Sequence, residues 1–355
     1  MEKFSRWRDS STGIQPFSTP LPSRRRTDSM EHLLFLLGEV LKPLLGIVKS
    51  VLVLLALLLL FLIRDMIGVL LLPLGAVHRA FRSIFTALLT RLALLFMGFY
   101  WITVENVTLK RGRSHAKGHK KNISNRIKSG DVIVSNWCSY IDVLYFAFKF
   151  NPVFTQLYPA TNTLRPISLW RAIAIAGSYP EFKPPTNLET YKLKDLCQLA
   201  AKNRWGPIVI FPEATTSNGR ALLKFCPIFH EMSLPVKNCV IHVYAIKYDY
   251  EGFSPTYTVG SRFWHFMRLC GEFKNTLTVK HLATEESPSS PSFTASLQST
   301  STPFAKQDMV GSQVIHLLHQ ISRLRMTNLG VLDKADFLNY YWRTNSAYGK
   351  NRRIY

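Results

Sequence analysis

The longest uninterrupted apolar run of the chain, Val51–Ile63, lies near its N-terminus. Extended back to Leu44, it spans twenty positions, and at about 1.5 Å per residue such a helix can cross a bilayer. It has no polar face, which argues against a buried helix of a soluble protein. Arg64-Asp65 interrupts the run, and Met66–Val77 resumes it. Two arrangements fit this pattern: a single span, or a helical hairpin that returns on the same side.

Downstream, the hydrophobic pattern changes twice. Ile84–Ile102 is apolar but contains Arg91 and several aromatic residues, so we expect a helix that lies at the membrane interface or covers the core. From Asp131 to Lys280, short apolar runs alternate with helical patterns, which predicts an α/β sandwich. The expected strands are Val132–Ser135, Val153–Leu157, Pro207–Phe211, Cys239–Tyr248 and Thr276–Lys280, and the expected helices are Pro166–Ala176, Leu188–Lys202, Gly311–Met326 and Asp333–Trp342.

Shifts in composition divide the chain into five parts. A signal peptide is not expected, because the apolar region starts too late and runs too long. The parts are a polar N-terminal tail (1–30), membrane-anchoring hydrophobic helices (31–102), the α/β domain (103–283), a disordered Ser/Thr/Pro linker (284–305) and a basic helical C-terminal segment (306–355).

The formal net charge of +22 calls for an anionic partner. Eight lysines and arginines and no acid fall between Lys110 and Lys128. This stretch is either a solvated loop or a cytosol-facing patch held by anionic lipid head groups. Nucleic acid is not an expected partner, because the chain has a segment apolar enough to cross a membrane and no nucleic-acid-binding motif. The five cysteines are scattered without a CxxC pair, which favours a reducing compartment and predicts no metal site.

Polar groups that could do chemistry gather in three blocks. One follows the expected strand that ends at Phe211, and polar groups at strand ends are typical of sites in open α/β sheets. The blocks are Ser135-Asn136-Trp137-Cys138-Ser139-Tyr140-Ile141-Asp142, Gly177-Ser178-Tyr179-Pro180-Glu181-Phe182-Lys183 and Phe211-Pro212-Glu213-Ala214-Thr215-Thr216-Ser217-Asn218-Gly219-Arg220.

These blocks resemble those of the PlsC-like glycerolipid acyltransferases. The last matches their FPEGT block, in the T-[TS]-N-G-R form of lysophospholipid acyltransferases. The first matches Asn-His-x-x-x-x-Asp, with Trp137 where the family has histidine, and the middle one loosely matches G-x-x-F-I-x-R. The opening stretch from Met1 to Phe17 is similar to the start of the fungal lysophosphatidic acid acyltransferases of lipid droplets. The resemblance covers roughly residues 83–280 plus this opening stretch.

The resemblance implies a glycerolipid-acyltransferase-like α/β sandwich, anchored to endoplasmic reticulum or lipid droplets with its catalytic domain facing the cytosol. The implied reaction takes acyl-CoA, as co-substrate without a further cofactor, and a lysophospholipid, best matched by lysophosphatidic acid, to phosphatidic acid. The implied surroundings are a membrane with anionic lipid. The alternative is a catalytically inactive acyltransferase fold that serves as an adaptor at these membranes. Trp137 and Ala214, which replaces the family's glycine, favour that alternative.

In this family a histidine deprotonates the acceptor hydroxyl and the aspartate orients it. By resemblance the catalytic candidates here are Asn136 and Asp142, and Asp142 either accepts a hydrogen bond from the acceptor or orients a base such as His230 or His242. A helix should start near Asp142, which as a plain alternative is a first-turn aspartate favoured by the helix dipole. Trp137 cannot act as a base, since its indole nitrogen only donates; it could bind an oxyanion, wall an acyl tunnel or pack in the core.

The remaining candidates bind substrate by resemblance. Arginine suits a phosphate through its bidentate donors, so Arg220 is the expected phosphate ligand. At Ala214 a Cβ is acceptable only if the backbone needs no positive φ. The substrate-binding candidates are Glu213, Thr215, Thr216, Asn218, Gly219, Arg220 and Lys183.

Overall fold

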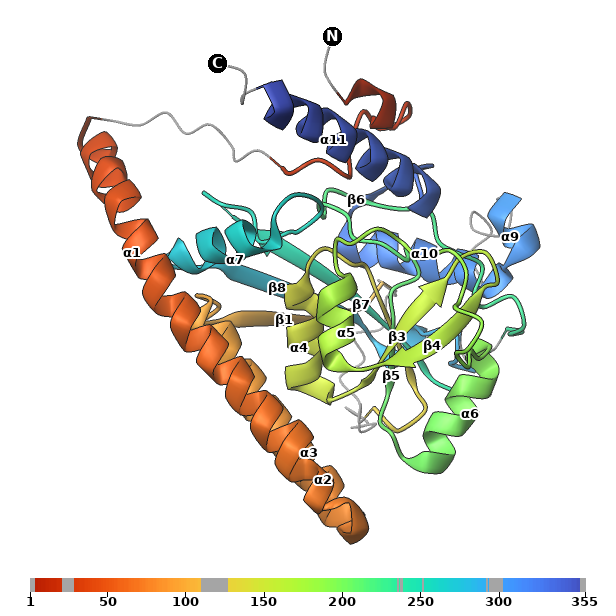
Figure 1. Ribbon diagram of the computed structural model, residues 1–355. Helices are drawn as coiled ribbons and strands as arrows, with labels where there is room; N and C mark the ends of the chain where they lie inside the picture. Colours follow the sequence, from red (N-terminus) through yellow and green to blue (C-terminus); the bar gives the residue numbers. More distant parts are fainter. Residues whose placement is uncertain are drawn as a thin grey trace, which may run out of the picture.

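A seven-stranded sheet forms the centre of the protein, in the order β1-β8-β7-β2-β5-β3-β4 (Figure 1). The computed structural model describes residues 4–20, 29–109, 127–234, 236, 239–250, 252–291, 293 and 303–351. The strands are β1 (Ile102–Val107), β2 (Val132–Ser135), β3 (Val153–Tyr158), β4 (Thr163–Ile167), β5 (Ile208–Ile210), β7 (Ile241–Asp249) and β8 (Thr276–Leu282), with β6 (Ala221–Leu222) and β9 (Arg325–Met326) forming a separate pair.

The four central strands β7, β2, β5 and β3 run parallel, and the expected α/β fold is confirmed. Strand β4 is antiparallel to β3, and β8 is antiparallel to β7. Val132 of β2 pairs with Ile208 on one side and Ile241 on the other, so the carboxyl ends of β2, β5 and β7 meet at one edge. That edge is where ligands bind in open parallel sheets.

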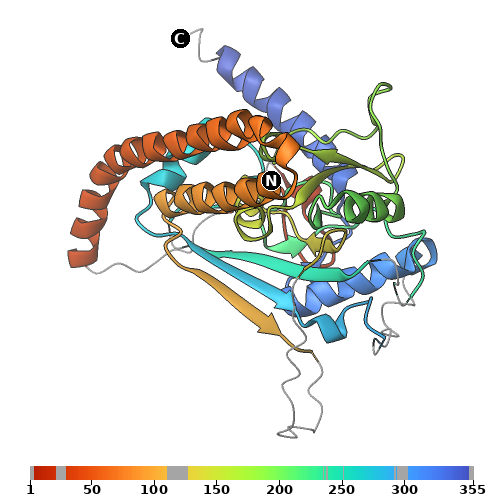
Figure 2. The same ribbon diagram turned by 90° about the horizontal axis from the view of Figure 1, so that it is seen from below.

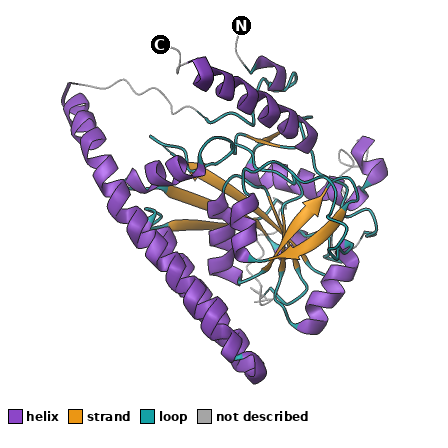
Figure 3. Ribbon diagram, viewed as in Figure 1, coloured by secondary structure: helices purple, strands orange, loops and turns teal. Residues whose placement is uncertain are grey.

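Alternation along the strands divides the core into two layers. Val132 and Val134 face one apolar cluster, while Ile133 faces the other. This is the period-two pattern of a strand buried on both faces. Helices cover the sheet on both sides (Figure 3). One cluster holds α4 (Tyr140–Phe150) and α5 (Leu169–Ile175), and the other holds α6 (Leu193–Asn203) and α10 (Met309–Ser322).

Two local expectations are wrong, and one strand was not expected. Pro166 and Ile167 end strand β4 instead of starting a helix, and proline is acceptable there because β4 is an edge strand. The helix expected from Leu188 starts at Leu193. Strand β1 was not foreseen, because it is an edge strand whose inner four residues are exposed and it lacks a buried pattern.

The N-terminal hydrophobic region forms a hairpin, but not at the predicted place: the helical path continues past Arg64-Asp65, and the returning arm is instead the following segment, expected as a separate interface helix. Helix α1 (Ser29–Leu60) continues through a π-helical turn (Phe61–Ile67), α2 (Gly68–Leu70) and a 3₁₀ turn (Leu72–Leu74), and α3 (Ala76–Phe96) returns alongside it (Figure 2). The reversal occurs at Gly75, whose φ of 44° suits glycine. One stretch, Leu41–Leu70, is long and apolar enough to cross a membrane.

The hairpin lies along the α/β domain for much of its length, with α1 against α7 (Arg262–Gly271) and α3 against α4. Its other side exposes apolar side chains, and an apolar patch of this size on a protein marks a contact with membrane or partner. The exposed residues include Leu44, Val48, Val51, Leu55, Leu58, Leu62, Met66, Leu70, Leu74, Val77, Ile84 and Leu88.

The two ends of the chain pack together. Trp7 and Phe17 are buried against Phe337 of α11 (Val331–Asn351). Beside them Lys334 is fully buried, donates to the carbonyl of Thr258 at 2.8 Å, and has its pKa lowered to about 7 by burial. The basic stretch 110–126 and the middle of the expected linker, 294–302, lie outside the described residues.

Candidate active site

Asn136 directly follows strand β2 and ties it to β7. Its Nδ2 donates to the carbonyl of Ile246 at 3.0 Å, and its Oδ1 accepts from the amide of Ile246 at 2.8 Å. The side chain is buried, with Nδ2 also 3.1 Å from Cys138 Sγ. In this structure Asn136 therefore fixes the position of the turn that follows it.

Asp142 holds the same turn from the other side. Helix α4 starts two residues before it, as predicted. Its Oδ2 accepts from the amides of Cys138 at 2.6 Å and Ser139 at 2.9 Å, and its Oδ1 accepts from the hydroxyl of Tyr248. Burial raises the pKa of this carboxyl to about 7, against the opposing effect of the hydrogen bonds.

The two histidines named as bases have other contacts. His242 Nε2 lies 3.6 Å from Asp131 Oδ2, beside the start of β2 and away from its carboxyl end. His230 Nδ1 lies 2.9 Å from the carbonyl of Pro227, and its Nε2 faces Glu231. Among the described residues, the structure brings neither histidine into hydrogen-bond contact with Asp142.

Trp137 occupies the tip of the turn. Its ring stacks on Phe211, which directly follows β5, with centroids 4.7 Å apart and planes 13° from parallel. The indole is 5% exposed, and its Nε1 has no hydrogen-bond partner among the described residues. A buried donor without an acceptor is costly, which makes this N–H available to a bound oxygen atom.

Glu213 lies behind the pocket wall and is fully buried. Its Oε1 accepts from the amide of Leu223 at 3.4 Å, while Oε2 has no partner in the described part of the chain. Burial raises the pKa of this carboxyl well above its usual range, although the amides of Leu223 and Trp137 partly oppose the shift. Burial therefore disfavours the charged form of Glu213.

Ala214 has a φ of 55°, in the left-handed region. The condition under which a Cβ would be acceptable here, a backbone without positive φ, is therefore not met. A Cβ in this conformation costs roughly 1–2 kcal/mol, so the turn after Glu213 is strained. Thr216, two residues after Ala214, is buried with its hydroxyl unpartnered among the described residues.

The last residues of the third block make hydrogen bonds to other parts of the same chain. The Ser217 amide donates to the carbonyl of Trp137 at 2.9 Å, which joins two blocks directly. Asn218 holds the N-terminal segment, since its Nδ2 donates to the carbonyls of Gln15 at 2.7 Å and Ser18 at 3.0 Å. Gly219 has a φ of 69°, and a Cβ there would lie 3.2 Å from Cys138 Sγ. The local chain path thus requires glycine.

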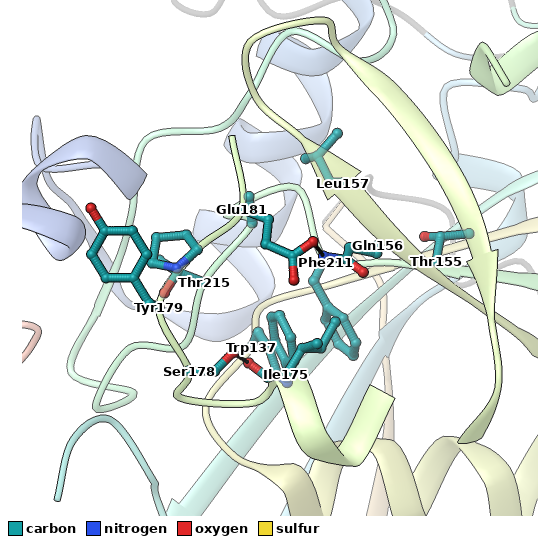
Figure 4. Close-up of a pocket in the computed structure, with 12 residues that line it drawn as sticks. Trp137, Thr155, Gln156, Leu157, Ile175, Ser178, Tyr179, Glu181, Phe211 and Thr215 are labelled. Carbon is teal, nitrogen blue, oxygen red and sulfur yellow. Dashed lines mark hydrogen bonds between the residues drawn. The ribbon is translucent and has the colours of Figure 1, made fainter. Parts of the chain in front are cut away.

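A pocket of about 30 Å³ lies where the three blocks meet (Figure 4). Its polar lining includes Trp137, Ser178, Glu181 and Thr215, with Gln156 from β3. Room for about one water is far less than an acyl chain needs, so substrate entry requires movement. The carboxyls of Asp142 and Glu213 are both fully buried, and neither lines this pocket.

Glu181 is the one carboxylate that lines this pocket within the described chain. Its Oε2 accepts from Gln156 Nε2 at 2.9 Å, and its Oε1 pairs with Arg171 at 2.5 Å. Sequence reasoning missed Gln156 and Glu181. The signal was present in β3, where Gln156 is a polar residue in a strand that also carries Phe154 and Leu157.

The two expected phosphate ligands lie outside the lining. Lys183 and Arg220 are exposed, and Arg220 Nη2 lies 3.5 Å from the hydroxyl of Tyr250. Of the substrate-binding candidates, only Thr215 lines the pocket. The others lie behind the wall, hold the N-terminal segment or face solvent.

Comparison with known proteins identifies relatives. Over 231 residues the chain is 31% identical to a provisionally named lysophosphatidic acid:oleoyl-CoA acyltransferase of Schizosaccharomyces pombe, covering 64% of this chain and 68% of that protein. Over 263 residues it is 26% identical to the lysophospholipid acyltransferase LPEAT1 of Arabidopsis thaliana, covering 69% of this chain and 60% of that protein. No family model and no solved structure matches the chain. The first relative exceeds the level at which shared ancestry is secure, and the chain belongs to the lysophospholipid acyltransferase family.

Proposed function

We propose that the protein transfers an acyl chain from acyl-CoA to the hydroxyl of lysophosphatidic acid, giving phosphatidic acid and CoA. The observation that carries this proposal is the convergence of all three blocks on one pocket with a carboxylate and an unpartnered N–H. The name of the S. pombe relative, which includes lysophosphatidic acid and oleoyl-CoA, supports this choice of acceptor and donor.

The chemistry needs a proton acceptor, and Glu181 takes that role in the proposal. The acceptor oxygen attacks the thioester carbonyl carbon while Glu181 receives the hydroxyl proton. The carbon–sulfur bond then breaks, and the CoA thiolate takes the proton. Arg171 and Gln156 hold the carboxylate in place, since both contact it.

Trp137 serves the developing oxyanion. Its Nε1–H is buried in the pocket wall without a partner, and a donor aimed at charge that develops in the transition state lowers the barrier. Asn136 and Asp142 act as positioning residues for this turn. Their hydrogen bonds to backbone groups of Ile246, Cys138 and Ser139 fix its path.

In this proposal the hairpin holds the site at a lipid surface. Its exposed apolar side faces away from the domain, and a hairpin that returns on one side can insert into a single leaflet. Such an insertion suits the cytosolic leaflet of endoplasmic reticulum and the monolayer of a lipid droplet alike. We place the catalytic domain on the cytosolic side of these membranes.

A second candidate function is an inactive adaptor of the same fold. Two observations favour it: a tryptophan stacked on Phe211 where the family has its histidine, and a pocket of only about 30 Å³. On this reading the pocket stays closed and the hairpin provides the membrane attachment.

One assay separates the candidates. The full-length protein in detergent micelles is given lysophosphatidic acid and oleoyl-CoA, and release of CoA and formation of phosphatidic acid are followed. We expect turnover by the wild type. If the wild type is inactive with a panel of lysophospholipids and Trp137→His gains turnover, the protein is a silenced acyltransferase and the adaptor function replaces the enzyme. An active wild type with lysophosphatidylethanolamine but not lysophosphatidic acid would change the acceptor alone.

A further inference from the structure

A second, larger cavity lies where the turn of the hairpin meets the domain. Its volume is about 580 Å³, and it shares no lining residue with the active-site pocket. One wall comes from the hairpin, and the other comes from the start of β3, the start of α5 and the end of α6. Strand β3 and helix α5 each contribute residues to both cavities, Val153 and Leu169 here against Gln156 and Ile175 at the pocket.

Arg64 is buried in this cavity wall with 7% of its side chain exposed. Its Nε has no hydrogen-bond partner among the described residues and lies 3.6 Å from Asp65 Oδ1. The other oxygen of Asp65 is taken by Trp170 Nε1 at 2.6 Å. A buried guanidinium with an unmet donor is unfavourable, so this position favours an additional acceptor.

Two more arginines approach the cavity from helix α3. Arg79 and Arg82 lie in its first two turns, and this first turn carries no acidic residue. Cations at the positive end of a helix dipole are unfavourable, and an anion at the same place is favourable. Arg204 faces them from the end of α6. In the described part of the chain, Arg79, Arg82 and Arg204 form no ion pair with an acidic side chain.

We propose that this cavity binds the phosphate of an anionic phospholipid head group, at a site separate from the acyl-transfer pocket. Guanidinium groups match phosphate oxygens with paired donors; four arginines line the cavity, its described lining contains no carboxylate, and Asp65 pairs with Arg64 alone. A cavity of this volume accommodates a glycerophosphate head group.

A lipid fits this cavity better than a soluble phosphate because of the surroundings. The hairpin turn beside it exposes Leu70, Leu72, Leu74 and Val77, each more than half exposed. These side chains would meet the acyl chains of a lipid whose phosphate lies among the arginines. Trp205 at the cavity is 41% exposed, and tryptophan is the residue type preferred at head-group depth.

The test measures the thermal midpoint of the full-length protein in neutral detergent micelles that contain increasing fractions of phosphatidylglycerol or phosphatidylcholine. A ligand that binds only the folded state raises the midpoint by mass action. We expect a saturable rise with phosphatidylglycerol alone. Arg79→Ala/Arg82→Ala should weaken the apparent affinity of the protein for phosphatidylglycerol at least tenfold. Arg204→Ala should weaken the same affinity by a smaller factor. The matched control is Lys194→Ala/Lys306→Ala, which removes the same charge from exposed positions on other surfaces.

Three results would overturn the proposal. The absence of a saturable rise in the wild type would exclude the site. An equal loss of affinity in the lysine control would show that the rise reflects overall charge. An equal rise with inorganic phosphate or glycerol 3-phosphate would assign the cavity to a soluble anion. Because Arg79 is exposed, the double variant is expected to fold, and circular dichroism without lipid checks this.

Discussion

The acyl-transfer pocket and the arginine cavity differ in how they treat charge. Behind the pocket, Asp142 is buried and accepts three hydrogen bonds and burial raises the pKa of Glu213, while the space left in the pocket is about 30 Å³. At the arginine cavity, Arg64 keeps an unmet donor beside other cations, and the space is about 580 Å³. The first region is closed although Trp137 Nε1 and Glu213 Oε2 stay without a partner among the described residues, whereas the second is open and sets several arginines against the single carboxylate of Asp65. The comparison teaches that the pocket must move to act, whereas the cavity only needs a ligand.

The largest effect is expected at Glu181. Glu181→Gln keeps the shape and the contact with Gln156 but removes the proton acceptor, so kcat should fall about 100-fold or more, within the usual contribution of a general base. The measurement is steady-state kinetics with both substrates. Glu189→Gln, which removes an exposed carboxylate bonded to Tyr191, is the control and should leave kcat unchanged.

Unchanged kcat in Glu181→Gln would remove Glu181 as the base and leave the pocket without a carboxylate that could serve. The thermal midpoint should change little, since the ion pair with Arg171 is more than a third exposed on both sides. A large fall in the midpoint would instead show that the lost activity reflects folding.

Arg220→Ala tests whether the acceptor phosphate binds near the pocket or in the arginine cavity. If Arg220 holds the acceptor, the KM for the lysophospholipid should rise about tenfold to a hundredfold, as expected for loss of a charge-assisted contact of about 1.5–3 kcal/mol. Arg79→Ala/Arg82→Ala is the companion variant and should leave this KM unchanged. In Arg220→Ala, a raised KM for acyl-CoA with an unchanged KM for the lysophospholipid would assign Arg220 to the donor. If Arg79→Ala/Arg82→Ala raises the KM for the lysophospholipid and Arg220→Ala does not, the acceptor phosphate binds in the arginine cavity.

Asp142→Asn tests whether the carboxylate of Asp142 is needed to hold the turn that carries Trp137. Asparagine has one oxygen for the three donors that Asp142 satisfies, so we expect a loss of about 1–3 kcal/mol of stability and at least a tenfold fall in kcat. Full activity with unchanged stability would contradict the role of this carboxyl in fixing the turn of Trp137.

The thermal midpoint of the wild type should depend on pH in a way that Asp142→Asn removes. The pKa of Asp142 is raised by burial from about 4 to about 7, so the folded state holds its proton more tightly than the unfolded state. This contribution to stability is present below about pH 4 and is lost as the pH rises towards 7. The wild-type thermal midpoint should therefore fall over this range by more than that of Asp142→Asn. Parallel pH profiles would show that Asp142 is not the titrating group.

The sequence predicted the central strands because they are buried on both faces and read as apolar runs. It also predicted a helix start near Asp142, since capping and a turn are local properties. It could not separate a span from a hairpin, because the packing of α1 along α7 is a long-range contact. The site was harder to predict from the sequence for the same reason. Gln156 and Glu181 come together only through the placement of β3, and Asn218 donates to Gln15, about two hundred residues away.

The smallest effect is expected at Ala214, where the two regions are again comparable. Each has a non-glycine residue with positive φ, Ala214 at 55° and Arg204 at 54°, but Arg204 ends a helix, where this conformation is common. Ala214→Gly should raise stability by about 0.5–1 kcal/mol, because relief of strain exceeds the entropy cost of glycine. Ala174→Gly, at an exposed position in α5, should lower stability by a similar amount. The measurement is chemical denaturation of both variants, with acyl transfer assayed in parallel. Destabilisation of both would show that the turn at Ala214 is not strained, whereas a stabilised Ala214→Gly with reduced turnover would show that the strain helps the closed pocket to open.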